Sequence, residues 1–184
     1  MENSLTPKKE NTPQVMNLKK KLLNVYSPAN CLKHVGKLRT IDHAMNADSP
    51  TIGTFKRELG KEFTEGLVMA WLMHLNTILN LNKPMSDEQI ELCAIDVVNE
   101  FYALKMSDLA FLFKRIYSGA YGEFYESLSI PKVMSFFRDY FNERCDRAEQ
   151  DSIRKHDSIK SDDTFNYTKN VQRIFQGISK NSKG

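Results

Sequence analysis

The apolar residues between Lys61 and Leu81 set the strongest limit on what this chain can fold into. They recur at intervals of three and four residues, which is the spacing of one face of an α-helix. The stripe is too broad for a helix that lies on a surface, so it predicts a helix at the centre of a core. Its members are Phe63, Leu67, Val68, Trp71, Leu72, Leu75, Ile78 and Leu79.

Start signals predict further helices before and after this segment. Serine followed by proline at 27–28 and 49–50 predicts helices that begin at residues 28 and 50, because serine caps a helix and proline suits its first position. Ser86 and Gln89 form a capping-box pair, in which each side chain bonds the other residue's backbone N–H. They predict a helix over 87–104.

Two more helices are predicted in the second half of the chain. Ser107 is the expected N-cap of a helix over 108–118, and Gly119 is expected to end it, since glycine adopts the positive φ found after many helices. Pro131 lies in the first turn of a predicted helix over 130–150. The link between them, residues 119–126, is short and aromatic.

No segment alternates apolar and polar residues over the length of a strand, so the predicted class is all-α. We expect a compact bundle of about five to six helices in residues 27–150. Residues 1–26 are predicted to be a basic amino-terminal arm, partly disordered. Residues 151–184 are predicted to be a basic flexible tail, with a linker over 151–165 and a short helix over 168–179.

The net charge of +3 is distributed unevenly. Residues 1–24 hold five Lys against two Glu, and residues 151–184 hold seven Lys plus Arg against four Asp, so each end carries +3. The 14 Lys plus Arg and 17 Asp plus Glu of residues 25–150 leave the middle at −3. Basic ends suit arms that touch nucleic acid, and equally ends that are merely solvated and disordered.

The compartment follows from what the sequence carries near its start and from its cysteines. Residues 1–10 are polar and no apolar run approaches a bilayer's thickness, so neither a secretory signal nor a membrane helix is predicted. Three cysteines are an odd number, which suits buried thiols in a reducing compartment better than a disulfide framework. The predicted location is cytoplasmic, which is the host cytoplasm for a phage-encoded protein.

Motifs for catalysis, metals and cofactors are incomplete in this sequence. Cys31 and His34 have the spacing of half a zinc site, but no second pair with short spacing accompanies them. Gly119 and Gly122 fit neither the phosphate loop GxxxxGK[ST] nor the dinucleotide pattern GxGxxG. We therefore predict a non-enzymatic protein that holds no metal and no small-molecule cofactor.

A basic and aromatic cluster follows the 108–118 helix and continues along the next one. Single-stranded nucleic acid binds cationic grooves with aromatic platforms, where each stacked base contributes ~1–3 kcal/mol. In the alternative interpretation the same rings are buried anchors that lock the last two helices together. The candidate binding residues are Lys114, Arg115, Tyr117, Gly119, Tyr121, Gly122, Tyr125, Arg138 and Arg144.

Three short motifs lie in order within residues 48–150, namely Met85-Ser-Asp-Glu-Gln89, Gly119-x-Tyr-Gly122 and Tyr140-Phe-Asn-Glu-Arg144. In this order they resemble an uncharacterised family of small all-helical proteins of phages and mobile elements. The resemblance implies a helical fold. It also implies a role similar to that of replication accessory proteins that load or restrain the replicative helicase. This implication is an analogy that depends on the shared helical fold and the phage genomic setting.

The leading hypothesis is therefore a non-enzymatic adaptor of phage-type or mobile-element DNA replication. Its expected partners are a replicative helicase or another replication protein and, as a further candidate, single-stranded DNA. The alternative hypothesis is a structural or cargo protein of a virion that docks into an assembly. A small DNA-binding regulator is disfavoured, because no predicted helix presents several exposed base-reading side chains.

Overall fold

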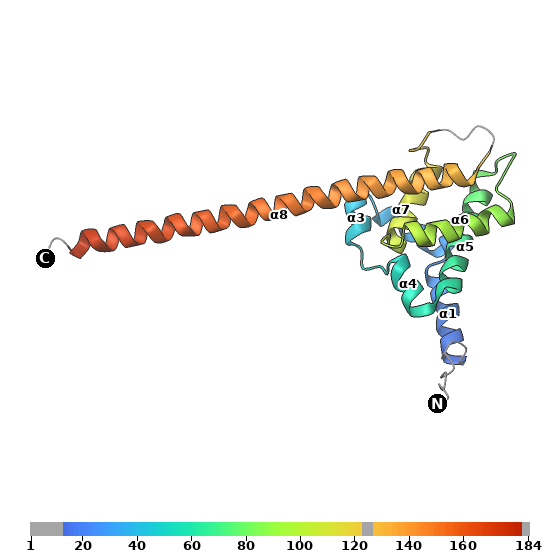
Figure 1. Ribbon diagram of the computed structural model, residues 1–184, viewed down its shortest axis with the longest axis horizontal. Coiled ribbons are helices and arrows are strands. Elements are labelled where there is room, and N and C mark those ends of the chain that lie inside the picture. The colour runs from blue at the N-terminus through green and yellow to red at the C-terminus, as the bar shows by residue number, and fades with distance from the viewer. Residues whose placement is uncertain (1–12, 123–126, 182–184) are drawn as a thin grey trace, which may run out of the picture. The chain divides into compact units, whose positions relative to one another are not determined.

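The computed structural model describes residues 13–122 and 127–181, and side chains as far as His156. Every regular element in these ranges is helical, which confirms the all-α prediction. The described residues fall into two compact units, one ending at Asn142 and one beginning at Glu143. The elements (Figure 1) are α1 (Pro13–Val25), α2 (Pro28–His34), the 3-10 helix η1 (Val35–Lys37), α3 (Ile41–Asn46), α4 (Ile52–Leu59), α5 (Lys61–Leu79), α6 (Asp87–Glu100), α7 (Met106–Tyr117) and α8 (Ile130–Asn181).

Helix α5 is the central helix of the first unit, as its apolar stripe predicts. Trp71 is fully buried, and its ring meets that of Phe113 on α7 edge to face, with 5.0 Å between the centroids. Ile78 departs from the prediction because its side chain is 44% exposed. It belongs to the last turn of α5, which ends at Asn80 in a left-handed conformation, so the stripe continues beyond the packed core.

The short connection between α5 and α6 makes them antiparallel neighbours. The Asn76 side chain fixes this connection, since its amide donates to the backbone carbonyl of Met85 and its oxygen accepts from the Met85 N–H. The predicted capping box then starts α6, with both hydrogen bonds between Ser86 and Gln89 present. As a result, the end of α6 lies beside the start of α5.

Two of the predicted helix caps are wrong. Helix α4 is capped by Thr51, whose hydroxyl accepts from the Thr54 N–H, and not by Ser49. The Ser49 hydroxyl accepts instead from the backbone N–H of Ser107. The Ser107 hydroxyl donates to the carbonyl of Ala44, so both serines connect α7 to the α3–α4 region.

Asp108 satisfies the start of α7 in place of the expected serine. One of its carboxylate oxygens accepts from the Lys105 N–H at 2.8 Å, and the other accepts from the Tyr140 hydroxyl at 2.7 Å. Asp108 and Tyr140 are both completely buried. The Lys105 ammonium donates to the carbonyls of Met45 and Ala47, so this network ties α3, α7 and the first turns of α8 together.

Helix α8 is longer than predicted. The sequence predicts a helix over 130–150, a linker over 151–165 and a short helix over 168–179, whereas one helix runs through all three ranges. No proline follows Pro131, and polar side chains one turn apart, such as Asp151 and Arg154 at 3.9 Å, suit a solvated helix. Low apolar content therefore does not exclude a helix over these residues. Residues 13–25 of the predicted arm are also helical.

The three cysteines are free thiols in different environments. Burial raises the pKa of the Cys31 thiol to about 11, and burial together with the Asp96 charge raises that of Cys93 to about 12. Cys145 is exposed. Compared with an ordinary cysteine, these pKa values leave about 100-fold less thiolate on Cys31 and about 1,000-fold less on Cys93 at neutral pH.

Iodoacetamide is therefore expected to alkylate Cys145 first, and to modify Cys31 about 100-fold and Cys93 about 1,000-fold more slowly in the folded protein. Peptide mass spectrometry over a time course measures the three rates. In urea the rates should converge. Native Cys93 reacting as fast as Cys145 would contradict the described burial.

Candidate functional site

The predicted basic and aromatic cluster begins where α7 ends. Gly119 and Gly122 both adopt positive φ, at 81° and 89°, which lets the chain turn sharply between Tyr117 and the link that follows. Tyr125 lies outside the described residues. Lys114, Arg115, Tyr117 and Tyr121 are half-buried around this turn.

Arg115 and Tyr121 join the turn to the core. The Arg115 guanidinium lies 5.1 Å from the centroid of the Tyr121 ring, and the Tyr121 ring lies 5.3 Å from that of Phe136 on α8. Phe136 is buried, and the Lys132 ammonium lies 5.0 Å from its centroid. These contacts favour the anchor interpretation for Tyr121, since its ring packs a link residue against α8.

Lys114 and Tyr117 also take part in packing. The Lys114 ammonium donates to the carbonyl of Leu38 at 3.4 Å, which connects α7 to the residue after η1. Tyr117 packs against the core, and burial raises the pKa of its hydroxyl. The charged side chains at the end of α7 therefore also stabilise the fold.

Arg138 makes its ion pair with α6 and not with this turn. Arg138 is held against α6 by a bidentate ion pair with Glu100, at 2.9 and 3.2 Å, and this hydrogen bonding raises the pKa of its guanidinium. Arg144 belongs to the second unit. The structure thus groups the candidates around 114–122 and assigns Arg138 to a different surface.

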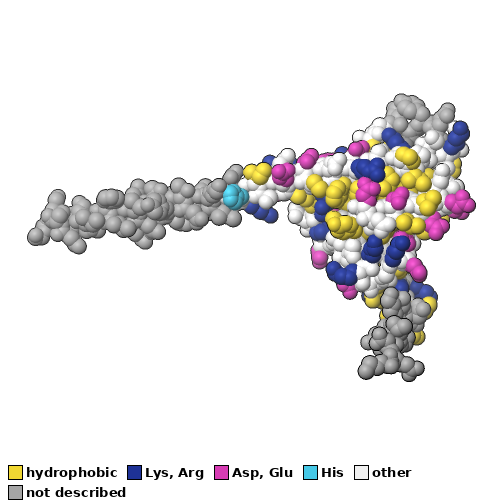
Figure 2. All heavy atoms as spheres, in the orientation of Figure 1, with side chains coloured by type: hydrophobic (Ala, Val, Ile, Leu, Met, Phe, Trp, Pro, Cys, Tyr) yellow, Lys and Arg dark blue, Asp and Glu magenta, His cyan; other side chains and the backbone are white. Residues whose placement is uncertain are grey.

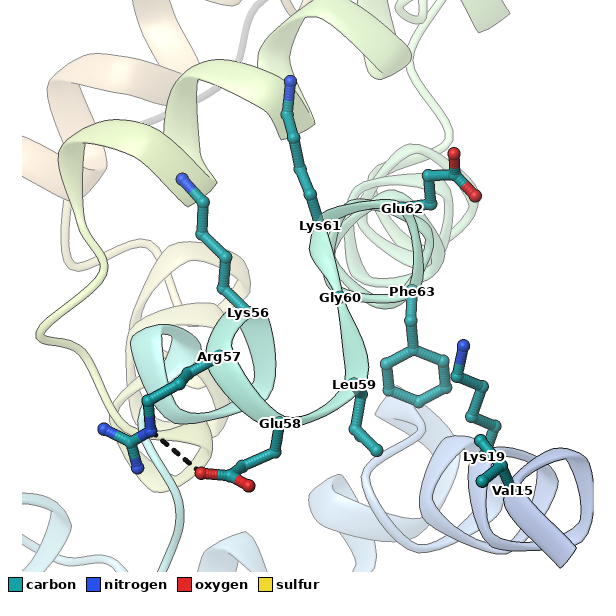
Figure 3. Close-up of a pocket in the computed structure, with 10 residues that line it drawn as sticks. All are labelled: Val15, Lys19, Lys56, Arg57, Glu58, Leu59, Gly60, Lys61, Glu62 and Phe63. Carbon is teal, nitrogen blue, oxygen red and sulfur yellow. Dashed lines mark hydrogen bonds and ion pairs between the residues drawn. The ribbon is translucent and has the colours of Figure 1, made fainter. Parts of the chain in front are cut away.

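A second cationic surface surrounds the α4–α5 junction and was not singled out by the sequence patterns. It is an open cleft of about 940 Å³ to which α1, α4 and α5 all contribute (Figure 3). We call it the basic cleft. Its lining residues are Val15, Lys19, Lys56, Arg57, Glu58, Leu59, Gly60, Lys61, Glu62 and Phe63.

The four cations of the basic cleft are held loosely. The Lys56 ammonium donates to the neutral amide of Asn99 at 2.9 Å, and the Lys19 ammonium lies 6.0 Å from the centroid of the Phe63 ring. Arg57 pairs with its neighbour Glu58, and Lys61 with Glu65 at 3.4 Å. The exposed Arg57–Glu58 pair contributes only ~0–1 kcal/mol, so an external anion competes with it readily.

The geometry of the junction directs two of these cations, Lys56 and Lys61, to one side of the backbone (Figure 3). Gly60 has a φ of 91°, which lets α5 start directly after α4 ends. Figure 3 shows the Lys56 and Lys61 side chains extending in the same direction on either side of Gly60. Glu58 and Glu62 reduce the net charge of the lining from +4 to +2. The positive end of the α5 dipole adds to this potential.

Charge is segregated over the first unit as a whole. Residues 13–61 contain nine Lys plus Arg against three Asp plus Glu, whereas α6 contains five Asp plus Glu and no Lys or Arg. On the face shown in Figure 2, basic side chains gather over the region that Figure 1 assigns to α4 and α1, with carboxylates among them. The basic cleft is thus part of a wider cationic end.

The cationic residues of the basic cleft lie in two separate segments of the sequence, so no single stretch indicates the cleft. Lys19 is separated by more than thirty residues from Lys56, Arg57 and Lys61, and only the packing of α1 beside α5 brings them together. That packing is fixed by the Trp71 indole N–H, which donates to the carbonyl of Tyr26 at 3.1 Å. Spacing along the chain does not report such a contact.

Metal sites and membrane spans have no candidates among the described residues. No group of three or more His, Cys, Asp and Glu side chains is arranged to hold a metal ion in the part of the chain that the structure describes. None of the helices there combines the length and the apolar content of a membrane span.

Comparisons with protein-family profiles, with curated proteins and with solved structures find no match to this chain. The resemblance to phage and mobile-element proteins therefore stays a prediction. The candidate site is described by its own chemistry alone.

Proposed function

We propose that this protein is a non-enzymatic adaptor of DNA replication that binds single-stranded DNA in its basic cleft. The observation that carries the proposal is that four cationic side chains from α1, α4 and α5 line one open cleft. Phosphate oxygens are the expected ligands of such a surface, since Lys and Arg bind them through charge-assisted hydrogen bonds.

The basic cleft also offers an apolar surface beside its charges. Phe63 is half-buried and lies next to Lys19, and Leu59 lies close to them in Figure 3. A cationic track beside an aromatic ring suits a single strand better than a duplex, because an unpaired base is free to stack. No sequence preference is expected from phosphate contacts alone.

The replication setting rests on the resemblance of residues 48–150, and the helicase partner is part of the same proposal. An adaptor needs a second surface for a protein, and the exposed acidic face of α6, whose carboxylates do not line the basic cleft, is the candidate. An affinity pull-down from the native host followed by mass spectrometry tests the partner. Recovery of virion proteins alone would contradict the replication role.

Binding to a fluorescently labelled single-stranded oligonucleotide, measured by anisotropy, tests the DNA half of the proposal. If the basic cleft contacts about three phosphates, the logarithm of the binding constant should fall with the logarithm of salt at a slope of about −2. Affinity should then drop about 15-fold between about 50 and 200 mM salt. No binding at low salt would remove single-stranded DNA from the proposal.

Paired substitutions decide which cationic surface is used. Lys56→Ala with Lys61→Ala is expected to weaken binding about tenfold, because it removes two phosphate contacts. Lys114→Ala with Arg115→Ala removes the same charge from the turn after α7 and is expected to cost less than about threefold. The reverse order would move the binding surface to the predicted cluster.

A virion protein is the second candidate function, and the 52-residue α8 favours it, because a long helix is a common docking element in assemblies. Mass spectrometry of purified particles tests it. Presence of the protein in stoichiometric amounts would support this alternative over the adaptor.

A further inference from the structure

Several large apolar side chains of helix α1 are not covered by the rest of the first unit. None of its residues is fully buried, and only Val15, Lys19 and Leu22 are half-buried. Its other large apolar side chains are exposed, by 38% to 50%. They are Met16, Leu18, Leu23 and Val25.

The exposed residues of α1 form two stripes of similar composition. Met16, Lys20 and Leu23 follow the spacing i, i+4, i+7, so they lie on one side of the helix. Leu18, Lys21 and Val25 follow i, i+3, i+7 on the other side. In each stripe a lysine stands between two apolar side chains.

On helix α6 the apolar residues of the outer face are accompanied by carboxylates, whereas on α1 the exposed apolar residues are accompanied by lysines. Its inner face, from Ile90 to Val98, is buried, while Leu92 on the outer face is 57% exposed and Ile95 is half-buried beside it. Glu88, Glu91 and Asp96 surround this apolar pair and are exposed. The outer face of α6 therefore joins an apolar centre to a ring of carboxylates.

We propose that these two surfaces bind one another between copies, so that α1 of one copy docks on the outer face of α6 of a second. Either apolar stripe of α1 matches the Leu92 and Ile95 pair, and the lysine within that stripe, Lys20 or Lys21, matches the surrounding carboxylates. Such a contact links copies head-to-tail into chains or rings, or closes a two-fold dimer where both copies exchange it reciprocally, and each arrangement raises the mass above that of the monomer.

The proposed occupant is a second copy of the chain, because every copy carries both complementary surfaces. One helix on one helix is a small interface, so association is expected at about 10–100 µM protein. Salt should weaken it, since the charged pairs lie at the rim of the contact. Lys20 and Lys21 do not line the basic cleft, so this inference is independent of DNA binding.

Sedimentation velocity over a concentration series in low salt, without nucleic acid, tests the proposal with two charge-reversed variants. Lys20→Glu with Lys21→Glu inverts α1, and Glu88→Lys with Glu91→Lys inverts α6. All four side chains are exposed, so both variants are expected to fold. Circular dichroism and the emission of buried Trp71 check that they do.

The wild-type protein is expected to show a weight-average mass that rises above the monomer with concentration. Each variant alone should remain monomeric over the same range, with association weakened at least about tenfold. Mixing the two variants should restore association, because each inverted surface then meets an opposite charge. Wild-type protein that stays monomeric at the highest concentration, or variants that associate as well as wild type, would overturn the proposal.

Discussion

Replacing Asp108 with alanine is expected to lower the free energy of unfolding by about 3 kcal/mol, the largest single effect we expect among the polar residues. The carboxylate is completely buried and accepts from the Lys105 N–H and the Tyr140 hydroxyl. Alanine removes both acceptors and leaves the buried Tyr140 hydroxyl without this acceptor, which costs about 1–3 kcal/mol for such a group.

Urea unfolding followed by the fluorescence of Trp71, the single tryptophan, measures this change. Asp139→Ala is the matched control, because Asp139 is the exposed acid next to Tyr140, and its loss should cost less than about 0.5 kcal/mol. Tyr140→Phe removes one of the two hydrogen bonds and should fall between them. A loss below about 1 kcal/mol for Asp108→Ala would show that the network does not hold α7 to α8.

Reversing two charges in the basic cleft is expected to have the largest effect on DNA binding. Lys56→Glu with Lys61→Glu removes two cations that flank Gly60 in the sequence and places two carboxylates near the phosphates. Repulsion adds to the lost contacts, so affinity should fall by about 100-fold at low salt, which corresponds to about 2.7 kcal/mol. Anisotropy with the labelled single strand measures it.

A variant with the same change in net charge separates local from general electrostatics. Lys83→Glu with Lys132→Glu alters two exposed lysines outside the cleft lining. It should weaken binding less than about fivefold, because screening limits charges far from the bound strand. Equal losses in the two double variants would show that DNA responds only to the overall charge of the protein.

The central part of the fold follows from short-range patterns in the sequence. The stripe of α5 and the capping box of Ser86 and Gln89 are visible in sequence because each depends on residues three or four apart. Ser49 and Ser107 carry the same local signal for a cap, yet they bond to each other across the fold. The decisive contact there joins residues far apart in the chain, so no local pattern reports it.

The same physical reason explains the outcome for the candidate site. Gly119 and Gly122 mark a sharp turn correctly, since positive φ is a property of single residues. Arg115 and Tyr121 form a contact that packs the turn, which composition alone does not distinguish from a binding surface. The basic cleft depends on Lys19 meeting Phe63, a tertiary contact between α1 and α5.

Lysine acetylation footprinting, with and without a single-stranded oligonucleotide, tests the central claim most directly. Bound phosphates should shield the ammonium groups of Lys19, Lys56 and Lys61, while exposed Lys83 reacts at the same rate in both samples. Protection of these three lysines that disappears at high salt is the expected result. Unchanged reaction of Lys56 and Lys61 at oligonucleotide concentrations that saturate binding would contradict the assignment of DNA binding to the basic cleft.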